Sequence, residues 1–156
     1  MRSLEREFVG YDDLWKWSID EPERFWDSIW TYFDVKGSRP EGGSVLTSRA
    51  MPGASWFPGS KLSYAANVFE GRAPEDVAIV HSSEAEPPLE LTWGALARLT
   101  GRVRAGLGSL GVGHGDRVVG YLPNIPESVA IFLACSSLGA IWSSCSPEME
   151  IGRAHV

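Results

Sequence analysis

The chain has 156 residues, which is the length of about one domain. Its composition of 44% hydrophobic and 22% charged residues is globular and excludes disordered and fibrous classes. The formal net charge of −6 argues against a basic surface for nucleic acid. No apolar run reaches the ~18 residues that a membrane span needs, and the opening residues are charged rather than leader-like. We therefore expect a cytoplasmic protein without nucleic-acid or membrane partners.

Two helices and a long extended segment are predicted first. The apolar residues from Tyr11 to Ile19 recur with helical spacing and predict one helix. Asp20 is predicted to cap a second helix that has Pro22 in its first turn. Residues 35–59 are rich in Gly, Pro and Ser and predict an extended wrap, and 61–69 is predicted to be a short helix.

A hairpin and a long helix are predicted next. Residues 77–82 and 89–92 have the β-branched, alternating pattern of two hairpin strands. Thr92 is predicted to cap a helix with a leucine-rich face, and Gly111 to end it in a left-handed conformation. Residues 106–111 match G-x-G-x-x-G, but they close a helix instead of opening one, so the pattern indicates packing and not dinucleotide binding.

The last predicted elements form a strand–helix–strand crossover. Residues 117–122 and 140–144 are predicted strands, and Asn124 is predicted to cap a buried helix between them that Gly139 ends. Such a crossover joins parallel strands. The predicted fold class is α/β, with a helical and extended wrap followed by the first βα units of a larger, incomplete domain.

Few residues suggest chemistry by themselves. Phosphate-loop, nucleophile-elbow and zinc-protease patterns are missing from the sequence, so we predict no catalytic residue and no metal site. Cys135 is predicted to be a core residue, whereas Cys145 follows a strand end. Ser144 and Ser146 lie at the same strand exit, where open α/β sheets bind ligands. A polar strand exit without a ligand remains the alternative.

Several motifs resemble the adenylate-forming acyl-CoA synthetases. Residues 113–127 resemble the family's GDRV-x-x-YLPN-x-PE stretch, and 138–143 resemble the LGAIWS that follows it. Residues 142–147 and 56–67 resemble, more finely, the acetoacetyl-CoA synthetase subfamily. The sequence departs from that pattern at Ser63 and Ala66, where Asn and Glu are usual, and again after Pro147.

The resemblance implies an acid–thiol ligase. In that reaction acetoacetate and ATP give acetoacetyl-adenylate and pyrophosphate, magnesium assists, and coenzyme A then displaces AMP. The catalytic residues that the family uses lie downstream of the matched stretch. In the related acetyl-CoA synthetases the segment after this strand borders the coenzyme A site, so the resemblance implies that Ser144 and Ser146 lie at its edge. Positions 146–148 here do not share the residues of those enzymes. It also divides the chain into an N-terminal wrap, 1–70, and the start of an AMP-binding domain, 71–149.

Residues 150–156 form a third segment. Their sequence is what a common sequencing adapter encodes when it is read in frame. We therefore expect the native sequence to end near Met149 and residues 150–156 to be adapter read-through. The chain is then an N-terminal fragment without activity of its own. Alternatives are a fragment of an acetyl- or propionyl-type acyl-CoA synthetase, or a stand-alone module without catalysis. The sequence indicates no oligomeric state.

Overall fold

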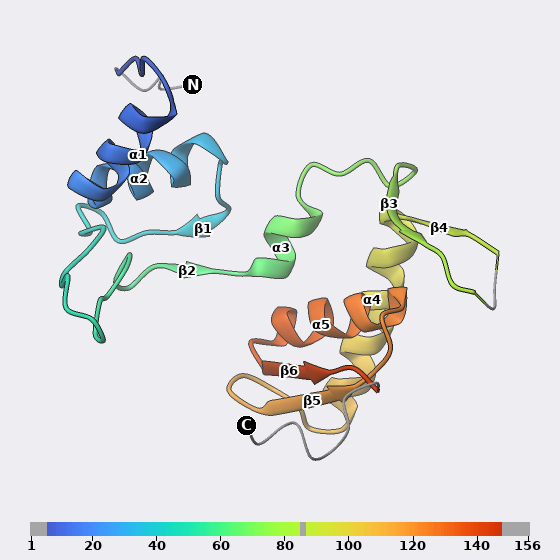
Figure 1. Ribbon diagram of the computed structural model, residues 1–156. Helices are drawn as coiled ribbons and strands as arrows, with labels where there is room; N and C mark the ends of the chain where they lie inside the picture. The colour runs from blue at the N-terminus through green and yellow to red at the C-terminus, as the bar shows by residue number, and fades with distance from the viewer. Residues whose placement is uncertain (1–5, 85–86, 148–156) are drawn as a thin grey trace. The chain divides into compact units, whose positions relative to one another are not determined.

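The computed structural model describes residues 6–84 and 87–147. The chain folds as two compact units, Met1–Leu62 and Ser63–Val156, each with its own helices and strands (Figure 1). No helix in the described ranges is both long and apolar enough to cross a membrane. Residues 150–156, with the predicted read-through, lie outside the described residues.

The first unit consists of two helices and a short two-stranded sheet. The helices are α1 (Tyr11–Asp20) and α2 (Pro22–Tyr32). Strand β1 (Gly37–Ser38) pairs antiparallel with β2 (Lys61–Leu62), so the predicted wrap leaves the sheet and returns to it. The two predicted helices are confirmed, and the wrap is an extended loop closed at its base.

Aromatic rings stacked on arginines hold the first unit together. Trp17, which is 5% exposed, packs against Phe8 and Phe25 with ring centroids 5.2 and 5.6 Å away. The Arg39 guanidinium lies 5.3 Å from the Trp30 ring and 4.9 Å from the Phe57 ring. Cations over aromatic faces stabilise such contacts electrostatically as well as by packing.

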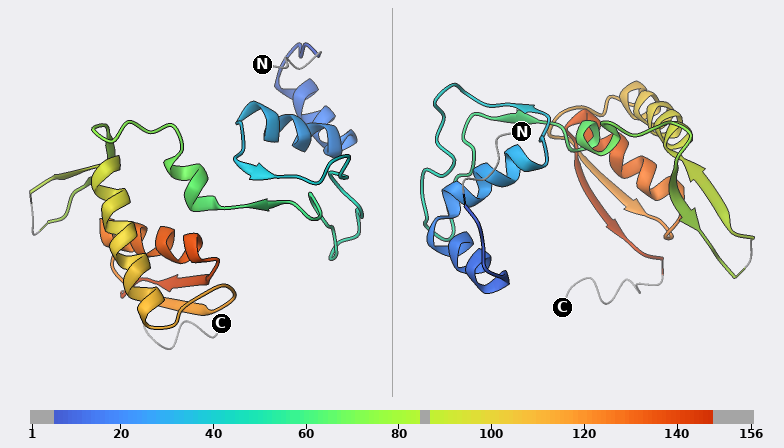
Figure 2. Two further views of the ribbon diagram at one scale, coloured as in Figure 1. Left: turned by 180° about the vertical axis from the view of Figure 1, so that it is seen from behind. Right: turned by 90° about the horizontal axis from the view of Figure 1, so that it is seen from above.

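The second unit contains the more regular part of the chain. Its elements in order are α3 (Tyr64–Phe69), β3 (Val77–His81), β4 (Leu89–Thr92), α4 (Trp93–Ser109), β5 (Arg117–Tyr121), α5 (Pro126–Leu138) and β6 (Ile141–Cys145). Strands β3 and β4 form an antiparallel hairpin, whereas β5 and β6 are parallel. Helices α4 and α5 pack against each other (Figures 1 and 2). The predicted hairpin and crossover are confirmed.

The apolar core of the second unit is built around α4 and α5. Ala65, Leu96, Ala130 and Leu133 form one buried cluster, and none of them is more than 3% exposed. Burial at this level is the main favourable contribution to folding. Cys135 on α5 is fully buried, as predicted.

Two predicted helix caps are wrong by one residue, for a shared reason. Asp20 is the last residue of α1, and Asn124 lies two residues before the start of α5, one residue before its N-cap. The N-cap residues are Glu21 and Ile125, and neither has a capping side-chain hydrogen bond. Each precedes the proline that opens its helix, and proline forces the preceding residue out of the helical conformation.

Other helix ends follow the predictions more closely. The Ala95 N–H donates to the Thr92 hydroxyl at 3.3 Å, so Thr92 caps α4. Gly111 and Gly139 have φ of +85° and +70°, the left-handed conformation that closes helices. The predicted helix 61–69 begins later than expected, at Tyr64, because its first two residues belong to β2.

Candidate functional site

An open hollow lies where β5 and β6 end and α5 begins. It has a volume of about 380 Å³ and contains both predicted site residues, Ser144 and Ser146. The strands run parallel, so their carboxyl ends share one edge of the sheet. Ligands of open α/β sheets bind at this edge.

Three segments supply the walls of the hollow. The turn after β5, the first turns of α5 and the end of β6 contribute Leu122, Pro123, Asn124, Ser128, Val129, Phe132, Trp142, Ser144, Cys145 and Ser146. None of these ten side chains is a carboxylate, a histidine, a lysine or an arginine. The hollow therefore offers apolar walls, hydroxyls and an amide, and it suits a neutral ligand group.

The Trp142 ring of β6 lies directly against Gly120 of β5. A Cβ atom at Gly120 would overlap the Trp142 ring and would lie 3.0 Å from Cδ1 of Leu122. Gly120 is buried and faces Ser144 in the register. The absence of a side chain at this position thus lets the indole lie across β5 and form part of the wall.

Hydrogen bonds fix the turn between β5 and α5. The Ser128 hydroxyl donates to the Pro123 carbonyl at 2.7 Å, and the Ile125 N–H donates to the same carbonyl at 3.0 Å. Ser128 is therefore occupied in shaping the turn. Ser144, by contrast, is exposed, and its hydroxyl makes no hydrogen bond among the described residues.

The exit of β6 is tied to the exit of β5 by two further bonds. The Leu122 N–H donates to the Cys145 carbonyl at 3.2 Å, which extends the ladder past the end of β5. The Tyr121 hydroxyl donates to the Pro147 carbonyl at 2.9 Å. Together these bonds set the direction in which the chain leaves the sheet.

The two cysteines differ in accessibility. Burial raises the pKa of the Cys135 thiol, so this residue stays protonated and unreactive. Cys145 is half-buried in the wall of the hollow, and both thiols are free. The structure thus separates a core cysteine from one that a reagent can reach.

Sequence reasoning found the strand exit but missed most of its surroundings. Ser144, Ser146 and Cys145 were predicted to lie there, and the structure brings them together. Phe132 was assigned only to a buried helix, and Tyr121 only to a strand. The alternation of strand residues could have indicated which side chains share a face with Ser144, but the contribution of α5 depends on tertiary packing.

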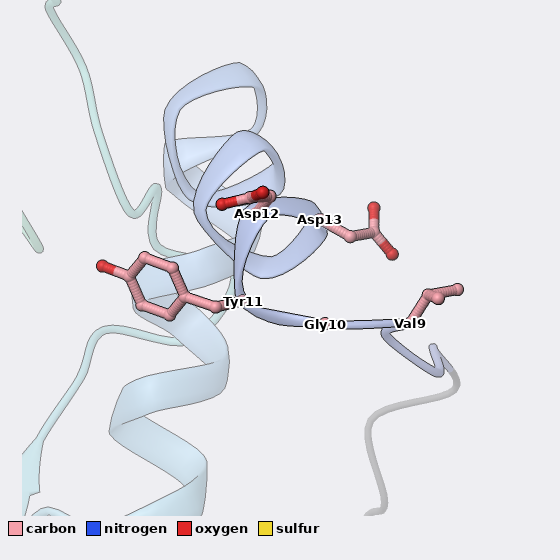
Figure 3. A pocket seen from close by; sticks show the side chains of 5 residues that line it. All are labelled: Val9, Gly10, Tyr11, Asp12 and Asp13. Atoms are coloured by element: carbon pink, nitrogen blue, oxygen red, sulfur yellow. The ribbon is translucent and has the colours of Figure 1, made fainter.

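A second, slightly smaller hollow lies at the start of α1 (Figure 3). Val9, Gly10, Tyr11, Asp12 and Asp13 line it, and the side chains of Tyr11 and Asp13 point to opposite sides. Asp13 lies 3.6 Å from Arg6 in an exposed ion pair. These features are those of a solvated helix start, and they converge on no common point.

The described ranges contain no group of three or more His, Cys, Asp or Glu residues that could hold a metal ion. The hydroxyl-lined hollow at the β5–β6 exit is the candidate site that the structure offers.

Two family models match this chain, one for each part of it. Residues 67–155 match the model described as AMP-binding enzyme, and residues 11–68 match the acetyl-coenzyme A synthetase N-terminus. The first match covers more than half of the chain. The chain belongs to the AMP-binding enzyme family.

Individual relatives point to one subfamily. The chain is 38% identical over 143 residues to an acetoacetyl-coenzyme A synthetase of Rhizobium meliloti and 37% identical over 154 residues to an acetoacetyl-CoA synthetase of Danio rerio. These matches cover 92% and 95% of this chain but only 22% and 23% of the relatives. The resemblance predicted from the motifs is thus confirmed.

A solved structure supports the same assignment. The acetoacetyl-CoA synthetase from Streptomyces lividans superimposes with a TM-score of 0.84 at 42% identity. The match covers 90% of this chain and 22% of the other. The predicted fold, an incomplete α/β domain of the adenylate-forming type, is consistent with this likeness.

Proposed function

We propose that this chain is the N-terminal part of an ATP-dependent acetoacetate–CoA ligase. The ligase converts acetoacetate, ATP and coenzyme A into acetoacetyl-CoA, AMP and pyrophosphate. The observation that carries the proposal is similarity to acetoacetyl-CoA synthetases along both units of the chain. The cytoplasmic location predicted from the sequence is part of the same proposal, and fractionation of expressing cells tests it.

The chain divides, in this proposal, into a wrap and the start of a catalytic domain. Residues 1–70 form the wrap, residues 71–149 begin the AMP-binding domain, and 150–156 derive from adapter read-through. Sequencing of the source locus beyond codon 149 tests the last assignment. The same seven codons followed by a stop codon in genomic DNA would contradict it.

The hollow at the β5–β6 exit borders coenzyme A in this proposal, with Ser144 and Ser146 on its rim. Its neutral lining supports this role for one portion of the cofactor. The pantetheine arm carries amides, a hydroxyl and methyl groups, which match hydroxyls and apolar walls. The phosphates of coenzyme A call for cationic side chains, which the lining lacks.

ATP and magnesium belong to the whole ligase in this proposal. Activation of a carboxylate by ATP requires groups that neutralise the charge moving onto pyrophosphate. The described residues gather no metal-binding cluster, so no step of that chemistry is assigned to them. We expect the 156-residue chain by itself to be catalytically inactive.

A pyrophosphate-release assay tests the proposed activity. The purified 156-residue chain should release no pyrophosphate, and acetoacetate-dependent release from it would contradict the fragment assignment. The product of the longer reading frame should release pyrophosphate with acetoacetate in preference to acetate or propionate. A preference for acetate or propionate would favour the alternative acyl-CoA synthetases.

Alanine variants of the rim test the coenzyme A assignment in that longer product. Ser144→Ala and Ser146→Ala should each raise the KM for coenzyme A about 3- to 10-fold, the loss expected for one hydrogen bond. The rate of adenylate formation, measured as the exchange of labelled pyrophosphate into ATP, should not change. Ser109→Ala, at the exposed end of α4, is the matched control. An unchanged KM in both rim variants would contradict the assignment.

A further inference from the structure

The segment after β6 is held in place from a distance along the chain. The Tyr121 hydroxyl reaches the Pro147 carbonyl, 26 residues further on, at 2.9 Å. We propose that Tyr121 is a positioning residue, which holds the Ser146–Pro147 segment so that the rim of the hollow keeps its shape. The effect of Tyr121 on ligand binding rests on the coenzyme A role proposed above.

The backbone ladder does not hold this segment by itself. The last β5–β6 pair is Tyr121 with Cys145, and one further backbone bond joins Leu122 to Cys145. Beyond Cys145, the described backbone bonds of this sheet end. The Tyr121 side chain adds an attachment at Pro147, two residues past the strand end.

The exposure of Tyr121 indicates that its hydroxyl, and not the packing of its ring, makes the specific contact of this side chain. The residue is 59% exposed, so its ring buries little area and contributes little by packing. The part of the side chain with a specific partner is the hydroxyl. Removal of that oxygen alone should therefore loosen the segment at Pro147 and leave the strand intact.

Cys145 reports on this release. It pairs with Tyr121 in the register, lies two residues before Pro147 and is half-buried. The other thiol of the chain, Cys135, is fully buried with a raised pKa. An aromatic disulfide reagent should therefore label one thiol quickly and the other slowly in the 156-residue chain.

Tyr121→Phe should raise the rate of the fast labelling phase about 3- to 10-fold, the population change that corresponds to one net hydrogen bond. The thermal midpoint should fall by only a few degrees, the change expected for the loss of one net hydrogen bond. Tyr64→Phe is the matched control, since Tyr64 is 55% exposed and its ring packs on Phe132. Cys145→Ser should abolish the fast phase. Equal labelling rates in Tyr121→Phe and Tyr64→Phe would overturn the proposal.

A second readout separates positioning from a purely structural role. In the product of the longer reading frame, Tyr121→Phe should raise the KM for coenzyme A by the same factor and leave pyrophosphate exchange unchanged. An unchanged KM, in an enzyme where Ser146→Ala raises it, would overturn the proposal. If neither rim serine affects that KM, the coenzyme A assignment fails, and thiol labelling alone decides the role of Tyr121.

Discussion

The two units of this chain are stabilised by different kinds of contact. Among the described residues of the first unit, Trp17 alone is buried, and most rings remain partly open to solvent. The second unit buries an aliphatic cluster on α4 and α5, with Ala130 and Ala134 at zero exposure. Aromatic and ionic contacts thus dominate one unit, and apolar burial dominates the other.

This difference teaches which perturbations each unit should feel. Exposed ion pairs contribute little and are screened by salt. Burial of apolar side chains is insensitive to charge but sensitive to a lost methyl group. The first unit should therefore respond to changes at arginine, and the second to changes of side-chain volume.

The largest effect is expected in the core of the second unit. Leu133→Ala removes a side chain that is 2% exposed and should lower the free energy of unfolding by about 2–5 kcal/mol. Leu110→Ala is the matched control, because Leu110 is 80% exposed and should cost under ~0.5 kcal/mol. Urea unfolding followed by circular dichroism measures both. Equal losses of unfolding free energy in the two variants would show that packing of α5 in the core does not stabilise this unit.

A smaller loss is expected at the arginine of the first unit. Arg39 lies between two rings and pairs with Asp27 at 2.5 Å. Arg39→Lys keeps the charge but loses the planar stack, and should cost about 1–2 kcal/mol.

Tryptophan fluorescence during urea unfolding measures this loss, because five of the seven tryptophans lie in the first unit. Arg24→Lys is the control, since the Arg24 side chain is 77% exposed in its pair with Glu21. It should change stability no more than the loss of other exposed surface pairs does. A similar loss of stability in Arg39→Lys and Arg24→Lys would show that stacking on the rings does not make Arg39 more important than an exposed arginine.

A gain in stability is expected at Thr100 on α4. Its hydroxyl is buried and has no hydrogen-bond partner among the described residues. Thr100→Val removes that unsatisfied group and should raise the free energy of unfolding by about 1 kcal/mol. Thr31→Val, which loses a bond from the Thr31 hydroxyl to the Asp27 carbonyl, should not stabilise the protein. Destabilisation by Thr100→Val, measured by thermal unfolding, would contradict the expectation.

The smallest effect concerns a titration. A hydrogen bond from Arg49 lowers the pKa of the Glu23 carboxyl below its ordinary value. A carboxyl whose pKa is lower in the folded than in the unfolded protein stabilises the folded state at pH values above its unfolded-state pKa. This stabilisation is lost as the pH falls through the pKa of the folded state. Arg49→Met should raise the pKa of Glu23 in a carboxyl NMR titration, whereas Arg24→Met should not. An unmoved pKa in Arg49→Met would show that the pair does not persist in solution.

Local chemistry explains why most elements could be predicted from sequence. The periodicity of α4 and the side chain of Thr92 lie close together along the chain, and their effects do not depend on distant residues. The caps at Asp20 and Asn124 were wrong for a local reason also. A proline at the first helical position fixes the N-cap at the residue before it, whatever polar side chain lies nearby.

The hollow could be predicted only in part, because it is assembled across the fold. Ser144 and Ser146 are visible as a polar strand exit. The contribution of Phe132 requires α5 to lie over the sheet, and the bond from Tyr121 to Pro147 spans 26 residues. No spacing within one element indicates either contact.

The constant register of the parallel strands has a consequence for folding during synthesis. Each β5 residue pairs with the residue 24 positions later, from Arg117 with Ile141 to Tyr121 with Cys145. Loops of this size close quickly, since closure entropy grows only slowly with length. The two strands therefore pair across a short loop, and α5 packs on α3 and α4, which precede it in the chain. We expect the crossover to form on the ribosome once β6 has left the exit tunnel.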